Sequence, residues 1–401
     1  MNMQFESHQA SDEDGNRIGS DSERLTVALQ DHIRRHFAPD RRKTLRAFPA
    51  PEVATLLGIT PSQLRNLRHL GKVPDLGTED GRKSLHYSAE EIDILRHALE
   101  KTSKTRGKFV PHRNDDEPLQ VIAVASFKGG SAKTTSAAHV AQSFALRGYR
   151  VLAIDLDPQA SLSTLMGVET DLDYENTTTI YDAIRFEEPL PMKEVVRKSF
   201  MHNLDVAPAG LILAEFEQEA AFFARGKVGV DPWHSRLGLA IKSVEHDYDV
   251  VVLDCPPSLG FLTLSAMRAA TGLLIPVIPN MLDVASLAHF TRMTHELLDV
   301  ISEISGPINF DFVRYVIARH EPTDAPQAQL AAFLRMQLME RVMTATFLKS
   351  TIVADAGMTN QTIYEIRRTD VTRASYDRAR ESFDAVGAEL DTLIQQAWGR
   401  V

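Results

Sequence analysis

The chain has 401 residues, a formal net charge of −10 and a single cysteine, with 43% hydrophobic and 24% charged residues. This composition is ordinary for a globular protein of more than one domain, and the lone Cys255 excludes an intrachain disulfide and a cysteine-based zinc site and favours the cytoplasm. The charge excludes a protein that coats DNA uniformly, so DNA contacts would need local basic patches, and no apolar run is long enough to predict a membrane anchor or signal peptide.

The N-terminal 45 residues are predicted to hold a tail and one helix. Residues 1–22 are polar and lack apolar periodicity, which predicts a disordered tail. Over residues 23–45 apolar side chains recur at helical spacing, at Leu25, Leu29, Ile33 and Phe37. A helix with one apolar stripe needs a partner, so we expect it to contact the next domain or a second copy of the chain.

Residues 46–100 are predicted to form a small helical domain. The stretch 41–86 carries nine Lys and Arg against four acids, so it is basic within an acidic chain. Helices are expected at 50–58 and 62–70, with Thr60 capping the second and Pro61 opening it. Two short helices joined by a tight turn are typical of a helix-turn-helix, and residues 71–74 and 82–87 are expected to form a β wing before a helix at 88–100.

The second of these helices has a polar face that suits DNA. Its leucines, including Leu70, are expected to pack inward, while its polar side chains are of the types that bind base edges and phosphates. The segment resembles a MerR-like winged helix-turn-helix, and the alternative is a basic helical hairpin that serves only as a spacer. The expected DNA-binding residues are Gln63, Arg65, Asn66, Arg68 and Lys72.

Residues 101–118 are polar and unperiodic and are predicted to be a linker. From residue 119 onward, buried apolar runs alternate with helical segments. This alternation predicts an α/β domain over residues 119–401, with a doubly wound, mostly parallel sheet. The expected strands are 121–125, 150–158, 203–207, 249–257, 272–278 and 312–318.

The first of these strands leads into a predicted phosphate-binding loop. A glycine-rich turn and then a helix rich in small residues follow it, so that backbone N–H groups and the helix dipole point at one spot. Lys133 is placed to reach the β- and γ-phosphates of a nucleotide, and the Thr134 hydroxyl to bind Mg²⁺. The alternative is a surface turn rich in Gly and Lys. The expected ATP-binding residues are Lys128, Gly129, Gly130, Ser131, Ala132, Lys133, Thr134 and Thr135.

Three carboxylates follow predicted strands at the same edge of the sheet as this loop. Asp155 and Asp157 end the second strand, and Asp254 ends the fourth. An Mg·ATP site needs carboxylates that hold the water ligands of the metal and one that orients the attacking water.

The combination of these motifs resembles the ParA/MinD family of ATPases. The two-lysine loop is similar to the deviant Walker A box of that family, except that Ala132 stands where the family usually has glycine, and residues 155–159 resemble its DxDPQ box. The resemblance implies a first lysine that reaches the nucleotide of a dimer partner and an Asp157 that positions the attacking water. It assigns catalysis to Lys128, Lys133 and Asp157, Mg²⁺ binding to Thr134, Asp155 and Asp254, and a γ-phosphate switch to Pro256 and Pro257.

With its N-terminal domain the chain resembles the long ParA proteins, and among them the RepA partition proteins of RepABC plasmid replicons. The resemblance implies a homodimer formed on ATP, weak intrinsic ATPase activity, non-specific DNA binding on the nucleoid, stimulation by a ParB-type partner and repression of its own operon. Arg367, Arg368 and Arg373 are candidates for the non-specific DNA contact. The adenine pocket is expected after the strand at 312–318, where residues 319–322 match no known pattern.

The last predicted helix bears on a competing function. Residues 374–398 carry an apolar stripe, but their polar face is rich in acids, so we expect the helix to pack on protein and not on lipid. This disfavours a membrane-cycling ATPase. A second alternative stays open, a transcriptional repressor that binds a nucleotide as a ligand with negligible turnover.

Overall fold

The structure, a computed structural model of the chain, describes residues 17–21, 24–25, 27–28, 43–79, 84–126, 128–168, 177–223 and 231–401. They belong to two compact units, residues 1–43 and 44–401. In the first unit residues 17–21, 24–25 and 27–28 are helical and exposed. Most of the predicted tail and of the predicted amphipathic helix lies outside the described residues.

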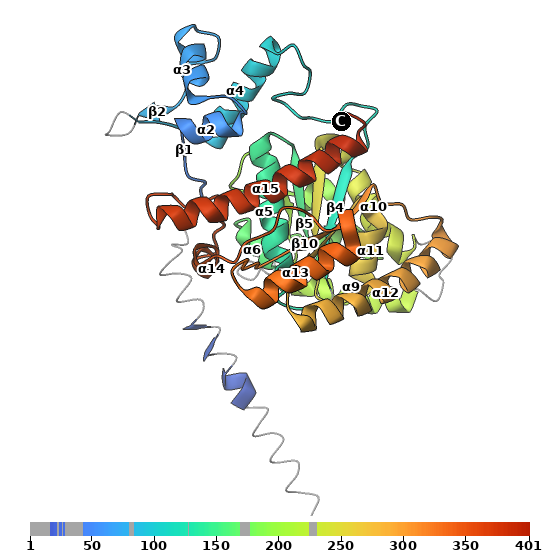
Figure 1. The fold of residues 1–401 in the computed structure, drawn as a ribbon. Coiled ribbons are helices and arrows are strands. Elements are labelled where there is room, and N and C mark those ends of the chain that lie inside the picture. Colours follow the sequence, from blue (N-terminus) through green and yellow to red (C-terminus); the bar gives the residue numbers. More distant parts are fainter. Residues whose placement is uncertain are drawn as a thin grey trace, which may run out of the picture. The chain divides into compact units, whose positions relative to one another are not determined.

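A seven-stranded sheet forms the centre of the second unit, in the order β10-β9-β4-β8-β5-β7-β6 (Figure 1). Every pair of neighbours is parallel except β6 and β7 at one edge. The predicted doubly wound, mostly parallel sheet is therefore confirmed, although the sequence did not predict the antiparallel edge strand. The strands are β4 (Gln120–Val124), β5 (Val151–Asp155), β6 (Arg197–Lys198), β7 (Leu204–Ala207), β8 (Val250–Asp254), β9 (Gly272–Val277) and β10 (Phe312–Ile317).

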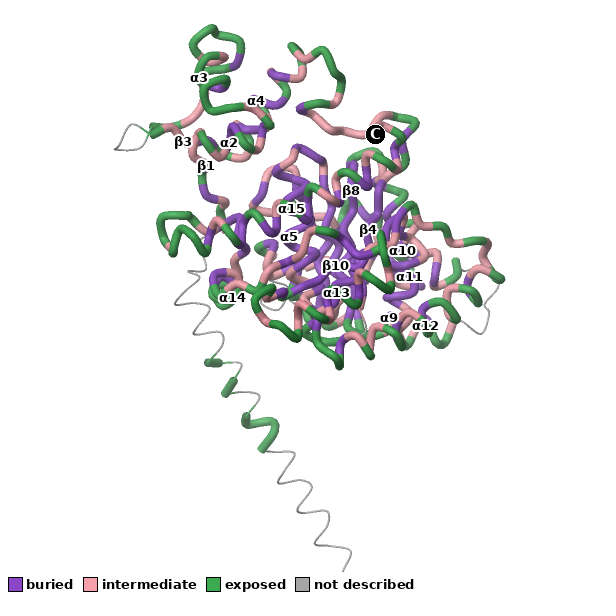
Figure 2. The backbone as a smooth tube through the Cα atoms, viewed as in Figure 1, coloured by how far each residue is buried: buried purple, intermediate pink, exposed green. Residues whose placement is uncertain are grey.

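Alternate side chains of each buried strand point to opposite faces of the sheet, so both faces are apolar. Helices cover both of them. Ile122 and Val124 belong to the core beneath α5 (Lys133–Arg147) and α15 (Arg373–Ala397). Val121 and Ala123 belong to the core on the other face, and Figure 2 shows this buried interior. The other helices of the α/β domain are α6 (Ser161–Leu165), α7 (Ile180–Ile184), α8 (Met192–Val195), α9 (Glu215–Phe223), α10 (Trp233–Lys242), α11 (Phe261–Ala269), α12 (Met281–Ser305), α13 (Ala325–Leu338) and α14 (Thr351–Met358).

The C-terminal helix α15 packs on α5, as its apolar stripe predicted. The stripe from Tyr376 to Trp398 is buried. The two helices approach so closely that a Cβ added at Gly387 would lie 2.1 Å from the Ser143 Oγ on α5. No described helix is long and apolar enough to span a membrane.

Residues 44–102 form a small domain of three helices and a three-stranded antiparallel sheet. Its helices are α2 (Ala50–Leu56), α3 (Pro61–His69) and α4 (Ala89–Thr102), and its strands are β1 (Phe48–Pro49), β2 (Thr78–Glu79) and β3 (Leu85–Tyr87). The sheet has the order β1-β3-β2. The Thr60 hydroxyl accepts a hydrogen bond from the Gln63 N–H at 3.1 Å, so Thr60 caps α3 as predicted.

Two expectations for this domain are wrong. Residues 71–74 form a turn and no strand, because Gly71 adopts a left-handed conformation (φ +64°) and Pro74 has no N–H to donate to a neighbouring strand. Leu70 is 57% exposed, because it follows the last turn of α3 and does not reach the core. The second half of the predicted wing includes Arg82 and Lys83, which lie outside the described residues.

The predicted linker joins the two domains in a fixed conformation. Residues 103–118 contain no helix or strand. Hydrogen bonds nevertheless hold them, among them those from the Arg113 Nε to the Tyr248 carbonyl (2.9 Å) and from the Arg400 Nη2 to the His112 carbonyl (2.7 Å). The buried Arg96 on α4 donates to the Leu146 carbonyl near the end of α5 at 2.7 Å. The small domain is thus hydrogen-bonded directly to the helix that begins at the phosphate loop.

Candidate functional site

The predicted phosphate loop lies between β4 and α5, as expected. Two of its residues have positive φ, Gly130 (φ +77°) and Ala132 (φ +67°), and Ala132 is the N-cap of α5. Left-handed backbone at a residue with a Cβ costs roughly 1 kcal/mol relative to glycine. The backbone therefore keeps the conformation that glycine would favour here, although this chain has alanine.

Lys133 is the first residue of α5 and its side chain points back into the loop. The residue is 6% exposed, and its Nζ donates a hydrogen bond to the Lys128 carbonyl at 3.0 Å. Burial lowers the pKa of Lys133, and the nearby charge of Asp254 opposes this shift. A buried lysine at a helix N-terminus provides a cation where phosphate oxygens would lie.

Two of the predicted carboxylates face each other at the carboxyl ends of adjacent strands. Asp155 of β5 and Asp254 of β8 are register partners, and Val124 at the end of β4 is the next partner of Asp254. Both carboxylates are fully buried. Asp155 accepts hydrogen bonds from the N–H and the hydroxyl of Ser163, both at 2.8 Å. No hydrogen bond of ordinary geometry reaches either carboxylate oxygen of Asp254 among the described residues, although the Thr134 hydroxyl lies close enough to lower the pKa of this carboxylate.

This pair of buried acids favours a cation at the site. Burial raises the pKa of Asp155 to about 6, and burial together with the charge of Asp155 raises the pKa of Asp254 well above its ordinary value. Mg²⁺ commonly binds through one or two carboxylates, waters and substrate phosphates, so Asp254 and the nearby Asp155 fit such an ion. The described residues contain no cluster of three or more His, Cys, Asp or Glu side chains that would hold a metal without these additional ligands.

Asp157 lies two residues beyond Asp155 and is less buried. Its N–H donates to the Asp155 carboxylate at 3.1 Å, and its own carboxylate accepts from the Gln159 N–H at 3.0 Å. The loop therefore holds Asp157 at the same sheet edge as the phosphate loop while leaving it half-buried. The role of Asp157 in positioning the attacking water stays a prediction.

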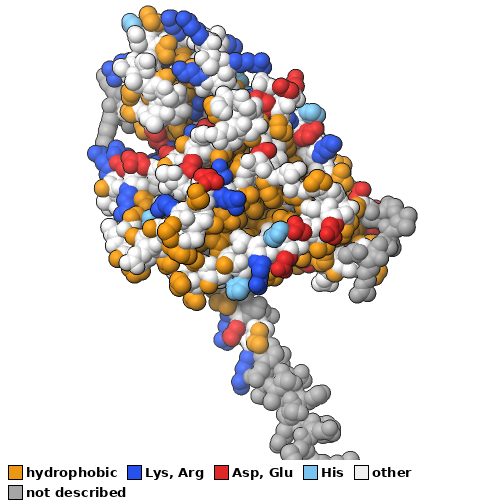
Figure 3. All heavy atoms as spheres, turned by 45° about the vertical axis from the view of Figure 1, so that its right-hand side comes forward, with side chains coloured by type: hydrophobic (Ala, Val, Ile, Leu, Met, Phe, Trp, Pro, Cys, Tyr) orange, Lys and Arg blue, Asp and Glu red, His pale blue; other side chains and the backbone are white. Residues whose placement is uncertain are grey.

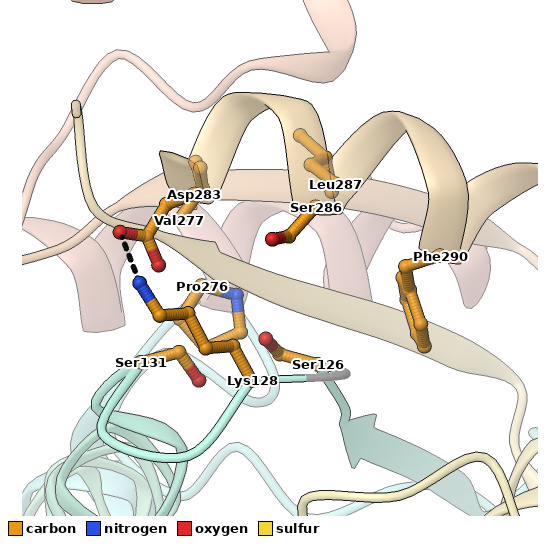
Figure 4. A pocket seen from close by; sticks show the side chains of 9 residues that line it. All are labelled: Ser126, Lys128, Ser131, Pro276, Val277, Asp283, Ser286, Leu287 and Phe290. Atoms are coloured by element: carbon orange, nitrogen blue, oxygen red, sulfur yellow. Dashed lines mark hydrogen bonds and ion pairs between the residues drawn. The ribbon is translucent and has the colours of Figure 1, made fainter. Parts of the chain in front are cut away.

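The first lysine of the loop contacts a residue that the sequence did not predict. The Lys128 Nζ lies 3.0 Å from the Asp283 carboxylate in the first turn of α12, and Figure 4 shows this ion pair at the rim of a small pocket. The Asp283 side chain is 5% exposed, and its N–H donates to the Asn280 side chain that caps the helix. Serines 126, 131 and 286 also line the pocket, and the buried Ser131 hydroxyl has no described partner.

The predicted switch lies beside these carboxylates. The Cys255 N–H donates to the Val124 carbonyl at 3.2 Å, so the loop with Pro256 and Pro257 begins next to the phosphate loop. Helix α11 follows it, and the Glu217 carboxylate caps its first N–H groups, with distances of 2.9 Å and 3.0 Å. Glu217 could not be identified from the sequence, because it lies 44 residues away on α9.

The loop after β10 contains the residues for which adenine contacts were expected. Arg319 has a left-handed backbone conformation (φ +50°), His320 is buried, and Glu321 forms an ion pair with Lys349 at 2.9 Å. The adenine contacts remain a prediction that the structure does not test.

The five candidate DNA-binding residues differ in their surroundings. Arg65, Asn66 and Lys72 are exposed. The Gln63 Oε1 accepts a hydrogen bond from the Thr60 N–H at 2.7 Å, so this side chain closes the capping box of α3. Arg68 is half-buried and forms an ion pair with Asp75 on the following turn.

Comparisons with known proteins show which chains and folds this protein resembles. Residues 119–304 match the family model described as AAA domain. The chain is 44% identical over 382 residues to a replication protein A of Rhizobium rhizogenes, covering 94% of this chain and 93% of the relative. It is 30% identical over 243 residues to the chromosome partitioning protein ParA of Caulobacter vibrioides, covering 60% of this chain and 84% of that protein. A solved structure described as a partition protein has a TM-score of 0.66 over 96% of this chain and 99% of that chain; at 16% identity it shows a shared fold alone.

Proposed function

Because the chain belongs to the ParA-type partition ATPases, we propose that it segregates a plasmid or related replicon through a cycle of ATP binding and hydrolysis. One observation carries this proposal. The buried Lys133 begins the helix behind the phosphate loop, and beside it the two buried oxygens of Asp254 accept no hydrogen bond of ordinary geometry from the described residues. This combination of a cation, a helix N-terminus and a buried carboxylate suits a nucleotide triphosphate with its metal.

Each side chain of the site has a role in this proposal. The loop N–H groups and Lys133 would bind the phosphates of ATP, and Asp254, Asp155 and the Thr134 hydroxyl would hold Mg²⁺. When bound, Mg²⁺ would neutralise the negative charge that develops on the phosphate oxygens. Asp157 orients the water that attacks the γ-phosphate, and Pro256 and Pro257 respond to the presence of that phosphate.

Lys128 acts on the nucleotide of a second copy of the chain. Its side chain is 44% exposed, and within the described part of the chain Asp283 is its only ion-pair partner. When ATP binds to two copies of the chain, the Lys128 ammonium group leaves Asp283 and contacts the phosphates of the nucleotide in the partner. The intrinsic ATPase activity is weak, because the complete site requires the dimer.

The DNA activities follow from the dimer and from the small domain. The ATP-bound dimer binds DNA without sequence preference, which places the protein on the nucleoid in the cytoplasm, and a ParB-type partner triggers hydrolysis and release. Helices α2 and α3 act as a helix-turn-helix that represses the operon of the protein itself. The exposed Arg65 and Asn66 on α3 support this proposal, and Arg367 and Arg373 are candidates for the non-specific contact. Arg368 is a weaker candidate because it forms an ion pair with Asp377.

Steady-state ATP turnover tests the proposal, measured alone, with duplex DNA and with DNA plus the ParB-type partner. We expect slow turnover that rises when both are present, and no nucleotide binding by the Lys133→Ala variant. ATP binding that never leads to hydrolysis under any of these conditions would overturn the enzymatic proposal. That result would instead favour a repressor that uses a nucleotide as a ligand.

A further inference from the structure

We propose that residues 101–108, which comprise the end of α4 and the basic loop that follows it, contact the DNA backbone beside α3. The inference rests on the proposed function of α3 as a DNA-reading helix and adds a second contact element to it. The sequence predicted only a linker for this segment.

The basic loop and α3 face each other across one groove of about 510 Å³. The loop contributes Lys104 and Lys108 to its walls, and α3 contributes Gln63 and Asn66. The same two residues of α3 also line a second hollow, together with Arg65. The surface is therefore continuous from the face of α3 that would read bases to the lysines of the loop.

The loop is held in place before any partner binds. The Glu100 carboxylate accepts hydrogen bonds from the N–H groups of Gly107 (2.6 Å) and Phe109 (2.8 Å). Phe109 is buried, and the Ser103 hydroxyl donates to the Thr105 carbonyl at 2.8 Å. A fixed loop loses little conformational entropy when it binds, which is the property of a built contact element and not of a free linker.

The charge of the loop identifies the partner as a polyanion. Residues 101–108 contain four basic side chains and no acid, in a chain with a net charge of −10. All four are exposed, and none forms an ion pair with a described residue. The nearby Glu100 carboxylate is occupied by the backbone of the loop, and Asp75 is paired with Arg68. Figure 3 shows Lys and Arg side chains gathered over this end of the molecule; residues 101–108 contribute Lys101, in the last turn of α4, and Lys104, Arg106 and Lys108.

The dimensions favour duplex DNA among polyanions. The nine residues of α3 form a helix about 14 Å long, and a helix with its side chains is about 10–12 Å across, which fits the roughly 12 Å width of the major groove. A helix of this length in the groove is flanked by the phosphates on either side. The loop that borders the groove beside α3 therefore meets the phosphate backbone, and its contacts add affinity without adding sequence preference.

The salt dependence of binding tests this inference. The parent and a Lys104→Ala, Lys108→Ala variant are titrated against a duplex from the region upstream of the gene and against a scrambled duplex, without ATP. Each lost phosphate contact should reduce the slope of log K against log salt by about 0.9, so the double variant should lose roughly 1.8 on both duplexes while keeping its preference for the upstream sequence. A Lys104→Arg, Lys108→Arg variant should retain the parental slope.

Two further variants separate this contact from other effects. Lys193→Ala, Lys242→Ala removes the same charge from α8 and α10 and should leave the slope unchanged. Asn66→Ala should lose the preference for the upstream duplex without a change in slope, because asparagine is neutral. A parent that discriminates between the duplexes, combined with an unchanged slope in the loop variant, would overturn the inference alone. A parent that shows no discrimination would overturn the proposed role of α3 and the inference together.

Discussion

Replacement of Asp254 by asparagine should stabilise the nucleotide-free protein while abolishing its response to Mg·ATP. In the parent two fully buried carboxylates face each other, and the oxygens of Asp254 accept no hydrogen bond of ordinary geometry from the described residues. Burial raises the pKa of Asp155 to about 6, and an ionised acid with that pKa, against an ordinary value of about 4, destabilises the fold by roughly 3 kcal/mol at neutral pH. The pKa of Asp254 is also raised, so removal of its charge should likewise stabilise the nucleotide-free fold.

The pH dependence has a definite sign. Between the ordinary pKa of about 4 and the raised values, the folded protein binds more protons than the unfolded chain, so stability falls as pH rises through this window. The variant has one ionisable group fewer and should lose less stability between pH 5 and pH 8. Its advantage over the parent should therefore be larger at pH 8.

Thermal melts at pH 5 and pH 8, with and without Mg·ATP, measure these effects. We expect the variant to melt several degrees above the parent at pH 8 without nucleotide, and to show no shift in Tm with Mg·ATP. Asp249→Asn at the other end of β8 is the matched control. Its carboxylate is bonded to Arg150 (2.6 Å) and His112 (2.8 Å), which lower its pKa, so this change should destabilise the protein. An Asp254→Asn variant less stable than the parent at pH 8 would refute the reasoning.

Three further predictions concern the loop, the first lysine and α3. Ala132→Gly should raise stability by roughly 1 kcal/mol in thermal melts, because glycine adopts φ +67° without strain; an equal or lower Tm would contradict this. Asp283→Ala should release Lys128 and lower the ATP concentration needed for dimerisation in light scattering, and an unchanged or higher requirement would show that the ion pair does not restrain the lysine. Arg65→Ala, Asn66→Ala should abolish operator binding and retain ATP-dependent binding to random DNA in gel shifts, and a parallel loss of both would make the small domain the general DNA anchor.

Patterns among residues that are close together in the sequence predicted the α/β domain and most of its proposed site. Strands buried on both faces are continuous apolar runs, so β4, β5 and β8 and the acids at their ends could be located without a structure. The phosphate loop follows β4 directly. The partly successful prediction of the small domain has the same origin, since the Thr60 cap and Pro61 are local signals.

Features that depend on residues far apart in the chain could not be predicted. Asp283 lies 155 residues from Lys128, and its acidic side chain at the start of a helix is common to many helices. Arg68 was expected to contact DNA, and only the fold shows that the turn after α3 brings Asp75 to it. The composition of the basic loop is typical of a linker, whereas the Glu100 carboxylate, which lies on α4, holds the loop in a fixed conformation.

The central claim, that each ATP site takes Lys128 from a second copy of the chain, is tested most directly by mixing two inactive variants. Lys128→Ala lacks the lysine given to the partner, and Asp157→Ala lacks the residue that orients water in its own site. In a mixed dimer the Lys128→Ala subunit keeps its own Asp157 and receives Lys128 from its partner, so one site is complete. The account predicts recovery to about a quarter of the parental turnover at equal mixing, since half of randomly assorted dimers are mixed and each has one complete site. A mixture as inactive as its two components would contradict the account.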